Sequence, residues 1–428
     1  MEIELKIISK ELIKPSSPTP DHLRKLQFSF IDQNQYPVSI PFVFFYEKSH
    51  IPNHERCNRL KRSLSQALTI FYPLAGRINN YSYADCNDEG ALFVETKANC
   101  QLSDILRNKN QYHNISKKFI PLQPDKGVHQ YGSLFQITYF NCGGLVVSFA
   151  MPHMLGDGLS QFVFLNGWAA VARGNKKVEI PPFGSTSNFP PRNIPGFDLS
   201  QWVFKEKIVT KPFVFNAFTI SSLKEKYSKD GEKLSRVQAL CVFLFSRIMA
   251  TLSPTAKKDN RYMAINSVNV RQILDPPIPN ESFGNLVWAA TALIDNLSEE
   301  DEIATRIKAS IRNVNAESLK KLQKGELSFT KETFMDSLKG EIVRYSFTSL
   351  CNFPTYDVDF GWGKPEWVTT SGVIFDNLVI CIDTKEGKGI EAWVNLTEED
   401  MARFEKDKLL ISHVSLAPNR NSNFNSRL

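Results

Sequence analysis

The chain has 428 residues, of which 42% are hydrophobic and 22% are charged, and its formal net charge is +6. A chain of this length is long for one hydrophobic core and predicts two domains. The composition is that of an ordinary soluble globular protein. The positive charge is too dilute to mark a nucleic-acid-binding surface, although it could help to attract a polyanionic ligand.

The sequence indicates no zinc site, disulfide framework, export signal or membrane span. Its seven cysteines form an odd set without a CxxC pair, which favours reduced, mostly buried thiols in an intracellular compartment. Residues 1–6 alternate charged and apolar side chains, unlike a signal peptide. The stretch 127–156 lacks Asp, Glu, Lys and Arg, but Gly143, Gly144 and Pro152 divide it into segments too short to cross a bilayer.

The spacing of apolar residues predicts a mixture of strands and helices in the first half of the chain. We expect strands over residues 3–7, 91–96, 134–140 and 145–151, and helices over residues 57–71 and 159–172. The first helix must end before Pro73, because a proline inside a helix removes a hydrogen bond and clashes with the preceding turn. The last two strands are expected to form a hairpin through a glycine-containing loop.

A proline-rich segment divides the chain. Residues 179–212 contain many prolines with scattered Ser, Asn and Gly, and predict a crossover linker between domains 1–178 and 213–428. In the second half we expect helices over residues 235–250 and 299–314 and from about 398, and strands over residues 262–271, 286–294, 373–375, 378–382 and 390–396. Strands interspersed with helices predict an α/β fold in both halves, and no internal sequence repeat is evident.

Two motifs point to chemistry. His153 ends an apolar run, and Asp157 and Gly158 follow at the start of a predicted helix. Imidazole has an ordinary pKa of about 6.5 and can accept and return a proton near neutral pH. A lone histidine usually just forms hydrogen bonds to neighbouring carbonyls, so this motif alone does not indicate catalysis. A catalytic role is supported by a second motif, Asp359–Gly363, which reads Asp-Phe-Gly-Trp-Gly.

Together the two motifs resemble the HxxxDG and DFGWG signatures of the plant BAHD family of acyl-CoA-dependent acyltransferases, in the same order and at a similar separation. Further segments stand in family order, namely residues 72–77, 85–90, 269–271, 283–285 and 389–393. The resemblance extends from about Leu12 to about Phe404. Residues 15–20 and 32–33 are most similar to the vinorine synthase-like alkaloid acetyltransferases.

This resemblance implies two chloramphenicol-acetyltransferase-like domains of mixed sheet plus helices, with a solvent channel at their interface. Acyl-CoA would enter the channel from one side and the acceptor from the other. By the same resemblance, His153 is the general base that takes the proton of an acceptor hydroxyl during its attack on the thioester, then protonates the departing thiolate. Both substrates would meet in one ternary complex, without a covalent acyl-enzyme.

The implied reaction moves acetyl from acetyl-CoA to a hydroxyl of a plant specialised metabolite such as an alkaloid. Three alternatives remain: a malonyl or other acyl donor, an amine acceptor, or a non-catalytic family member that acts as a partner protein. We expect a monomer with no metal, no permanently bound cofactor, and no nucleic-acid or membrane partner. GxSxG, Walker A, Rossmann and HExxH motifs are absent from the sequence.

Asp157 admits two interpretations. Its carboxylate could orient the imidazole, as in a catalytic triad, or it could pair with a cation to fix the loop. The resemblance favours the second role, with Arg271 as the expected partner. It also implies a structural role for Asp359, Gly361, Trp362 and Gly363, in a loop that lies away from His153, shapes the CoA channel and buries the Trp362 indole.

Two further site predictions rest on weaker patterns. Many relatives carry Thr-Ser-Trp before DFGWG, whereas this chain has Thr348-Ser349-Leu350. Thr348 is therefore a candidate oxyanion donor, and backbone N–H groups are the alternative. Ser235 and Arg236 begin a predicted helix, whose N-terminus would suit CoA phosphates, although an ordinary cap followed by a solvated arginine would look the same.

The C-terminal tripeptide bears on localisation. Residues 426–428 read Ser-Arg-Leu, close to the Ser-Lys-Leu peroxisomal address. The family is mainly cytosolic, so we expect a cytoplasmic protein, with the peroxisome as the alternative.

Overall fold

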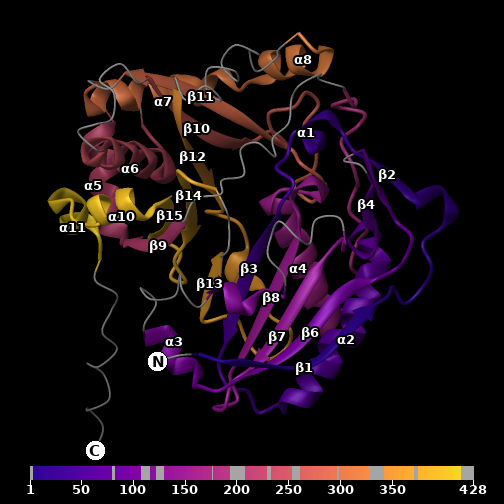
Figure 1. Cartoon of the computed structure of the whole chain (residues 1–428). Helices are drawn as coiled ribbons and strands as arrows, with labels where there is room; N and C mark the ends of the chain where they lie inside the picture. Colours follow the sequence, from indigo (N-terminus) through magenta and orange to yellow (C-terminus); the bar gives the residue numbers. More distant parts are fainter. Residues whose placement is uncertain are drawn as a thin grey trace, which may run out of the picture.

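Two six-stranded mixed sheets, each covered by helices, form the structure (Figure 1). The computed structural model describes residues 3–79, 82–107, 116–121, 130–175, 177–192, 208–228, 233–252, 261–295, 298–326, 342–370 and 375–415. The predicted α/β class is confirmed. Residues 373–374 of one predicted strand and the C-terminal tripeptide lie outside the described residues. None of the helices in the described ranges is long and apolar enough to cross a membrane.

The first sheet comes mainly from the first half of the chain. Its strands lie in the order β1 (Leu5–Ile13), β6 (Ala91–Ala98), β7 (Leu134–Tyr139), β8 (Leu145–Pro152), β3 (Ser39–Tyr46) and β13 (Trp367–Thr370). Only the β6–β7 pair is parallel. Helices α2 (Asn53–Ile70) and α4 (Gly158–Ala172) pack on each other and on this sheet.

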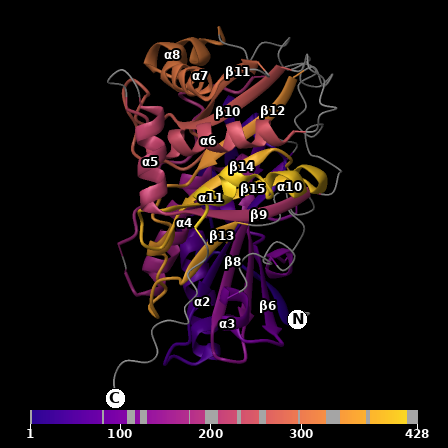
Figure 2. The same cartoon turned by 90° about the vertical axis from the view of Figure 1, so that its left-hand side faces the viewer.

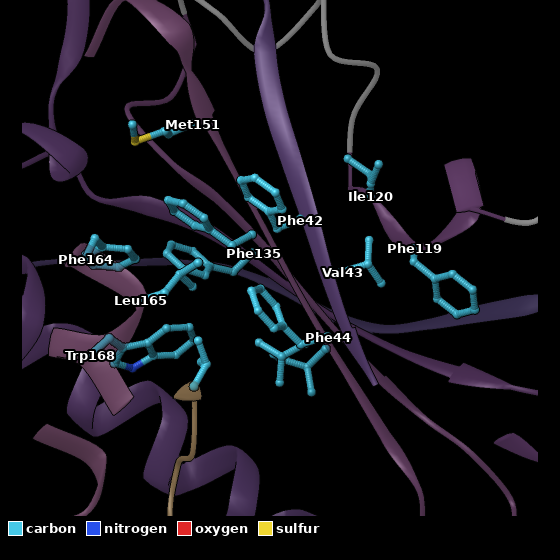
Figure 3. Close-up of a cluster of buried hydrophobic side chains, with 14 of the residues drawn as sticks. Phe42, Val43, Phe44, Phe119, Ile120, Phe135, Met151, Phe164, Leu165 and Trp168 are labelled. Carbon is cyan, nitrogen blue, oxygen red and sulfur yellow. The ribbon is translucent and has the colours of Figure 1, made fainter. Parts of the chain in front are cut away.

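Aromatic side chains fill the space between α4 and the first sheet. Phe164, Leu165 and Trp168 project from α4 toward Phe42 and Phe135 on the strands (Figure 3). The Trp168 ring lies 5.1 Å from that of Phe135, centroid to centroid, in an edge-to-face arrangement. This core fixes the start of α4, and therefore the segment between β8 and α4 that carries His153.

The second sheet has the order β11 (Val287–Asp295), β10 (Arg261–Asn269), β12 (Ile342–Ser349), β14 (Leu378–Asp383), β15 (Ile390–Thr397) and β9 (Ile208–Phe215). Helices cover its side away from the first sheet, as Figures 1 and 2 show together. They are α5 (Ala217–Tyr227), α6 (Arg236–Thr251), α7 (Glu300–Asn313), α10 (Glu398–Phe404) and α11 (Lys408–His413).

Shorter elements connect these layers. They are the small sheet β2 (Lys25–Gln27), β5 (Tyr83–Asp85) and β4 (Arg77–Asn79), the helices α1 (Phe30–Gln33), α3 (Leu102–Arg107) and α8 (Ala316–Lys324), and 3-10 turns at Asp21–Leu23, Tyr72–Ala75, Ser116–Phe119, His153–Leu155 and Thr355–Asp357. Helix α1 lies beside the His153 turn, which makes it part of the site described below.

One strand crosses between the two halves. After β12 the chain leaves the second sheet, contributes β13 to the edge of the first sheet beside β3, and returns to form β14. The hydroxyl of Tyr46 on β3 donates to the carbonyl of Val358 in the crossing segment, at 2.7 Å. The crossing segment carries Asp359–Gly363, which explains why a motif from the second half lies on the first. The proposed domain boundaries stay a prediction.

Most predicted elements are present, and the exceptions have physical reasons. Strand β3 was not predicted because it is buried on both faces and therefore lacks alternation. It also contains Pro41, which argues against a central strand. Residues 208–212, at the end of the predicted linker, lie in β9. Pro212 is tolerated there because β9 is an edge strand.

The α4 core generates a stability prediction. Trp168 is 0% exposed and its Nε1 donates to the hydroxyl of Ser63 at 3.0 Å. Trp168→Ala should lower the free energy of unfolding by about 3–5 kcal/mol, because it leaves a cavity and removes the hydrogen bond to Ser63. Phe218, 80% exposed, supplies the control, and Phe218→Ala should change the free energy by less than about 0.5 kcal/mol. Equal urea midpoints for the two variants would contradict this assignment of the core.

Candidate active site

His153 sits on a strand–turn–helix connection. It follows β8, forms one 3-10 turn with the next two residues, and precedes α4, which begins at Gly158. Its backbone N–H donates to the carbonyl of Val38 at 2.8 Å. A Cβ added to Gly156 would stand 2.8 Å from the Cβ of Ser160, so this turn requires glycine. The connection therefore fixes the backbone of His153 and leaves its ring half-buried.

Asn285, from the second half of the chain, holds the ring of His153. Its Oδ1 atom lies 3.1 Å from Nδ1 of the imidazole. Its Nδ2 atom donates to the backbone carbonyl of His153 at 2.8 Å and to that of Met154 at 3.3 Å. Nδ2 also donates to Oδ1 of Asp32 at 2.9 Å.

These contacts decide where the imidazole carries its proton. Three acceptors surround Nδ2 of Asn285, so the amide nitrogen belongs on that side and the amide oxygen faces the ring. An acceptor beside Nδ1 requires the proton of a neutral imidazole to lie on Nδ1. Nε2 then keeps a free lone pair, which is what a general base needs.

Burial keeps this imidazole neutral. Loss of solvent lowers the pKa of His153 below its ordinary value, and the charge of Asp157 and the hydrogen bonds to the ring oppose this effect only in part. A lowered pKa leaves the ring unprotonated at neutral pH and somewhat below it. The site therefore offers a base rather than an imidazolium.

Asp157 caps α4 and pairs with Arg271. Its Oδ1 accepts from the backbone N–H of Ser160 at 2.9 Å, and from the hydroxyl of Ser160 at 3.0 Å. Arg271 binds both carboxylate oxygens, with Nη1 2.8 Å from Oδ2 and Nη2 3.1 Å from Oδ1. Both side chains are buried, with Asp157 6% and Arg271 0% exposed. The described hydrogen bonds of Asp157 do not reach the imidazole.

The buried pair is satisfied by backbone groups. Arg271 also donates to the carbonyls of Ser282, at 2.9 Å, and Gly284, at 3.3 Å. Burial alone would raise the pKa of Asp157, but the charge of Arg271 and hydrogen bonds from Ser160 and Leu286 hold it below its ordinary value. The pair is therefore an ion pair whose charges depend on each other.

Asp157 also fixes the backbone on both sides of Asn285. Its backbone N–H donates to the carbonyl of Gly284 at 3.3 Å. Its Oδ2 accepts from the N–H of Leu286 at 3.0 Å. Gly284 has a φ of +142°, which strongly favours glycine. Asn285 is thus held between two residues that Asp157 binds directly.

Three other predicted site residues lie around the N-terminus of α6. Ser235 caps this helix and forms a capping box with Gln238. Arg236 pairs with Asp383 at 3.0 Å. Thr348 and Ser235 help to line one cavity of about 250 Å³, and His153 is not among the described residues around it. The cap gives Ser235 a structural role, and the ion pair gives one to Arg236.

Leu350 brings the Thr348 segment close to the His153 motif. A Cβ added to Gly158 would stand 2.7 Å from Cδ2 of Leu350, so this leucine packs on the first turn of α4. The position at which many relatives carry tryptophan therefore adjoins Asp157 and Gly158. A leucine here contributes no N–H donor.

The Asp359–Gly363 loop lies at the other end of β8 from His153. Oδ1 of Asp359 accepts the backbone N–H groups of Gly361, at 2.8 Å, and Gly363, at 2.9 Å, and so closes the loop on itself. Phe360 and Trp362 pack against Tyr46, which pairs with Leu145 at the start of β8. The length of β8 separates the loop from His153 by roughly 24 Å along the strand.

The expected burial of the Trp362 indole is only partly met. Trp362 is half-buried, while its neighbour Phe360 is 0% exposed and lies 4.6 Å from the Trp168 ring, centroid to centroid. Phe360 occupies the core position, and Trp362 stacks on it from outside at 5.5 Å. The backbone carbonyl of Asp359 accepts a hydrogen bond from Arg173 at the end of α4.

The structure thus brings together His153, Asp157 and Arg271, and places Thr348, Ser235 and Arg236 in a neighbouring region. Two residues of the site were not predicted as such. Asn285 was noted only within a family segment and Asp32 only as a mark of similarity. No local pattern reveals the part that either residue plays in the site, because the contacts of Asn285 with His153 and with Asp32 span more than a hundred residues of the chain.

Comparisons with known proteins identify the family of the chain. A family model described as the Transferase family matches residues 3–410. Stemmadenine O-acetyltransferase of Catharanthus roseus is 34% identical, over 96% of this chain and 98% of its own length. Limonoid 7-O-acetyltransferase of Citrus sinensis is 33% identical, over 97% of this chain and 99% of its own length. The crystal structure of vinorine synthase, an enzyme of Rauvolfia serpentina, matches with a TM-score of 0.85, at 32% identity, over 96% of this chain and 99% of that one.

The Asp157–Arg271 pair supports a double-mutant prediction. Asp157→Asn and Arg271→Met should each lower the free energy of unfolding by about 3–5 kcal/mol, because each leaves a buried charge without its partner. The double variant should lose clearly less than the sum, since the second change removes the stranded charge. Urea unfolding measures all three.

The exposed pair Lys364–Asp357, whose side chains are 62% and 57% exposed, is the control. Lys364→Met should leave the free energy of unfolding nearly unchanged, because an exposed ion pair contributes little. Strictly additive losses at Asp157 and Arg271 would show that the two charges are not coupled.

Proposed function

Because the chain belongs to the Transferase family of acyl-CoA-dependent acyltransferases, the BAHD enzymes, we propose that it transfers acetyl from acetyl-CoA to a hydroxyl of a plant specialised metabolite. The proposal rests on one observation above all. Asn285 engages Nδ1 of His153, so the imidazole presents Nε2 as a base.

In the proposed reaction, Nε2 of His153 takes the proton of the acceptor hydroxyl while the oxygen attacks the thioester carbonyl. The resulting tetrahedral intermediate then collapses, the carbon–sulfur bond breaks, and the imidazolium returns the proton to the departing thiolate. Asp157 stays ionised beside Arg271 throughout and takes no proton. Both substrates bind before any bond changes, so no acyl-enzyme forms.

The developing oxyanion needs donors, and Thr348 remains our candidate side chain. It belongs to the same strand end as Leu350, which packs on Gly158. With leucine at position 350, this segment supplies no indole N–H, and its donors are the hydroxyls of Thr348 and Ser349 and backbone N–H groups.

We place acyl-CoA along the cavity at the start of α6. Ser235, Asn266 and Thr348 are among the residues that line it. Asn266 is 6% exposed, and its Nδ2 has no hydrogen-bond partner among the residues that the structure describes. A buried N–H donor in a cavity favours a ligand with carbonyl oxygens, and the pantetheine arm has two amide carbonyls. The N-terminus of α6, with Arg236, would face the phosphates.

The names of the relatives support the proposed acceptor class. Stemmadenine O-acetyltransferase and limonoid 7-O-acetyltransferase are O-acetyltransferases by name. We therefore propose an alcohol on a rigid, largely apolar polycyclic skeleton, of the alkaloid or terpenoid kind. Purified protein screened with acetyl-CoA and malonyl-CoA against such alcohols tests both the donor and the acceptor.

The proposed base predicts the outcome of its removal. His153→Gln should lower kcat by at least about 10²-fold, because no other group takes the hydroxyl proton. KM for acetyl-CoA should change little, and the far-UV circular dichroism should stay that of the wild type. His54→Gln, at an exposed position in α2, serves as the control. Unchanged turnover in His153→Gln would contradict the mechanism.

The lowered pKa of His153 predicts the pH dependence. Activity requires the neutral ring, and burial moves its protonation to lower pH. As the pH is lowered, kcat/KM should therefore still be at its plateau value at pH ~6.5, the ordinary pKa of histidine. It should fall only at a more acidic pH. A loss of kcat/KM centred above that pH would show that the imidazole is not shielded as described.

A further inference from the structure

Asp32 is a buried carboxylate with no assigned role, and it lies behind Asn285. It is 3% exposed and belongs to α1, the short helix beside the His153 turn. Its Oδ1 accepts two hydrogen bonds from Asn285, one from the backbone N–H and one from Nδ2, both at 2.9 Å. A single oxygen atom therefore binds both the main chain and the side chain of Asn285.

The second oxygen of Asp32 serves a different purpose. Oδ2 accepts from the backbone N–H of Ser29 at 2.9 Å and from its hydroxyl at 2.7 Å. These contacts complete the capping box at the start of α1. The two oxygens thus have separable roles, since Oδ2 caps a helix and Oδ1 binds Asn285.

Burial raises the pKa of Asp32, while its hydrogen bonds with Ser29 and Asn285 act to lower it. Its four partner groups are hydrogen-bond donors. Because the Asp32 carboxylate accepts all four of these hydrogen bonds, each group must keep its N–H or O–H turned toward it. The Nδ2 group of Asn285 in particular must stay turned toward Oδ1.

A flipped Asn285 amide would change the chemistry of the ring. Its oxygen would face Oδ1 of Asp32 and the carbonyl of His153, both of which are acceptors. Its NH₂ group would face Nδ1 of the imidazole. Nδ1 would then have to accept, the ring proton would move to Nε2, and the base would be lost.

We propose that Asp32 is a positioning residue for acyl transfer, which holds the Asn285 amide so that His153 carries its proton on Nδ1 and presents a bare Nε2. Asp32 itself touches neither the imidazole nor the reacting atoms. The proposal deepens the role of His153 and rests on the proposed function. This role differs from a purely structural one, because loss of Asp32 would change which nitrogen of His153 carries the proton.

The test compares two variants that both disturb the capping box of α1. Asp32→Ala removes both sets of contacts, whereas Ser29→Ala removes the cap and leaves Oδ1 on Asn285. In Asp32→Ala, kcat should fall about 10–100-fold, by analogy with groups that orient a metal-binding histidine, while KM for acetyl-CoA stays within about twofold. In Ser29→Ala, kcat should stay near the wild-type value.

The decisive measurement is the tautomer of the His153 imidazole. ¹⁵N spectra of histidine-labelled protein distinguish the two tautomers, and His153→Gln identifies the signals of His153. Wild type and Ser29→Ala should show Nδ1 protonated, whereas Asp32→Ala should show a mixture or the Nε2–H form. This measurement needs no turnover, so it separates a failure of the positioning role from a failure of the proposed reaction.

Asp32→Asn covers the case in which the alanine variant does not fold. It keeps the volume and one acceptor oxygen, but turns an NH₂ group toward donors on one side. It should show a smaller loss of kcat than Asp32→Ala, with partial loss of the Nδ1–H signal. A wild-type tautomer in a folded Asp32 variant, or an equal loss of kcat in Ser29→Ala, would overturn the proposal.

Discussion

The arrangement of the site depends on one buried ion pair, which joins the two halves of the chain. Asp157 follows the last strand of the first half, and Arg271 follows β10 of the second sheet. The carboxylate also starts α4 and binds the backbone on either side of Asn285. A buried pair of this kind adds little net stability against apolar groups, but its loss strands a charge. The role of the Asp157–Arg271 pair is therefore to fix the position of Asn285.

Two acidic residues thus act on the histidine without touching it. Asp157 fixes the backbone around Asn285, and Asp32 fixes the side-chain amide. A neutral amide, rather than a carboxylate, meets the imidazole. Such a partner selects the tautomer without adding a negative charge beside the ring, so burial can keep the pKa of His153 low. This suits a base that must accept a proton and soon release it.

Sequence patterns predicted elements whose signals lie within one segment, and they did not predict contacts between segments that are far apart in the chain. The helix over 235–250 was found because an apolar face and a cap lie within one segment, and it corresponds to α6. Strand β13 pairs across the two halves, and no local signal reports such a crossing. Asn285 and Asp32 are likewise defined by distant partners. Asp157 and Arg271 were paired by family resemblance, since a separation of 114 residues carries no physical signal.

We propose that His153 accepts and returns a proton and that no residue of the protein carries the acyl group. Intact-mass spectrometry of the protein after incubation with acetyl-CoA alone tests this claim most directly. Direct transfer predicts an unmodified mass at every time point. An acetyl adduct that forms within the turnover time and disappears on addition of an acceptor alcohol would contradict it.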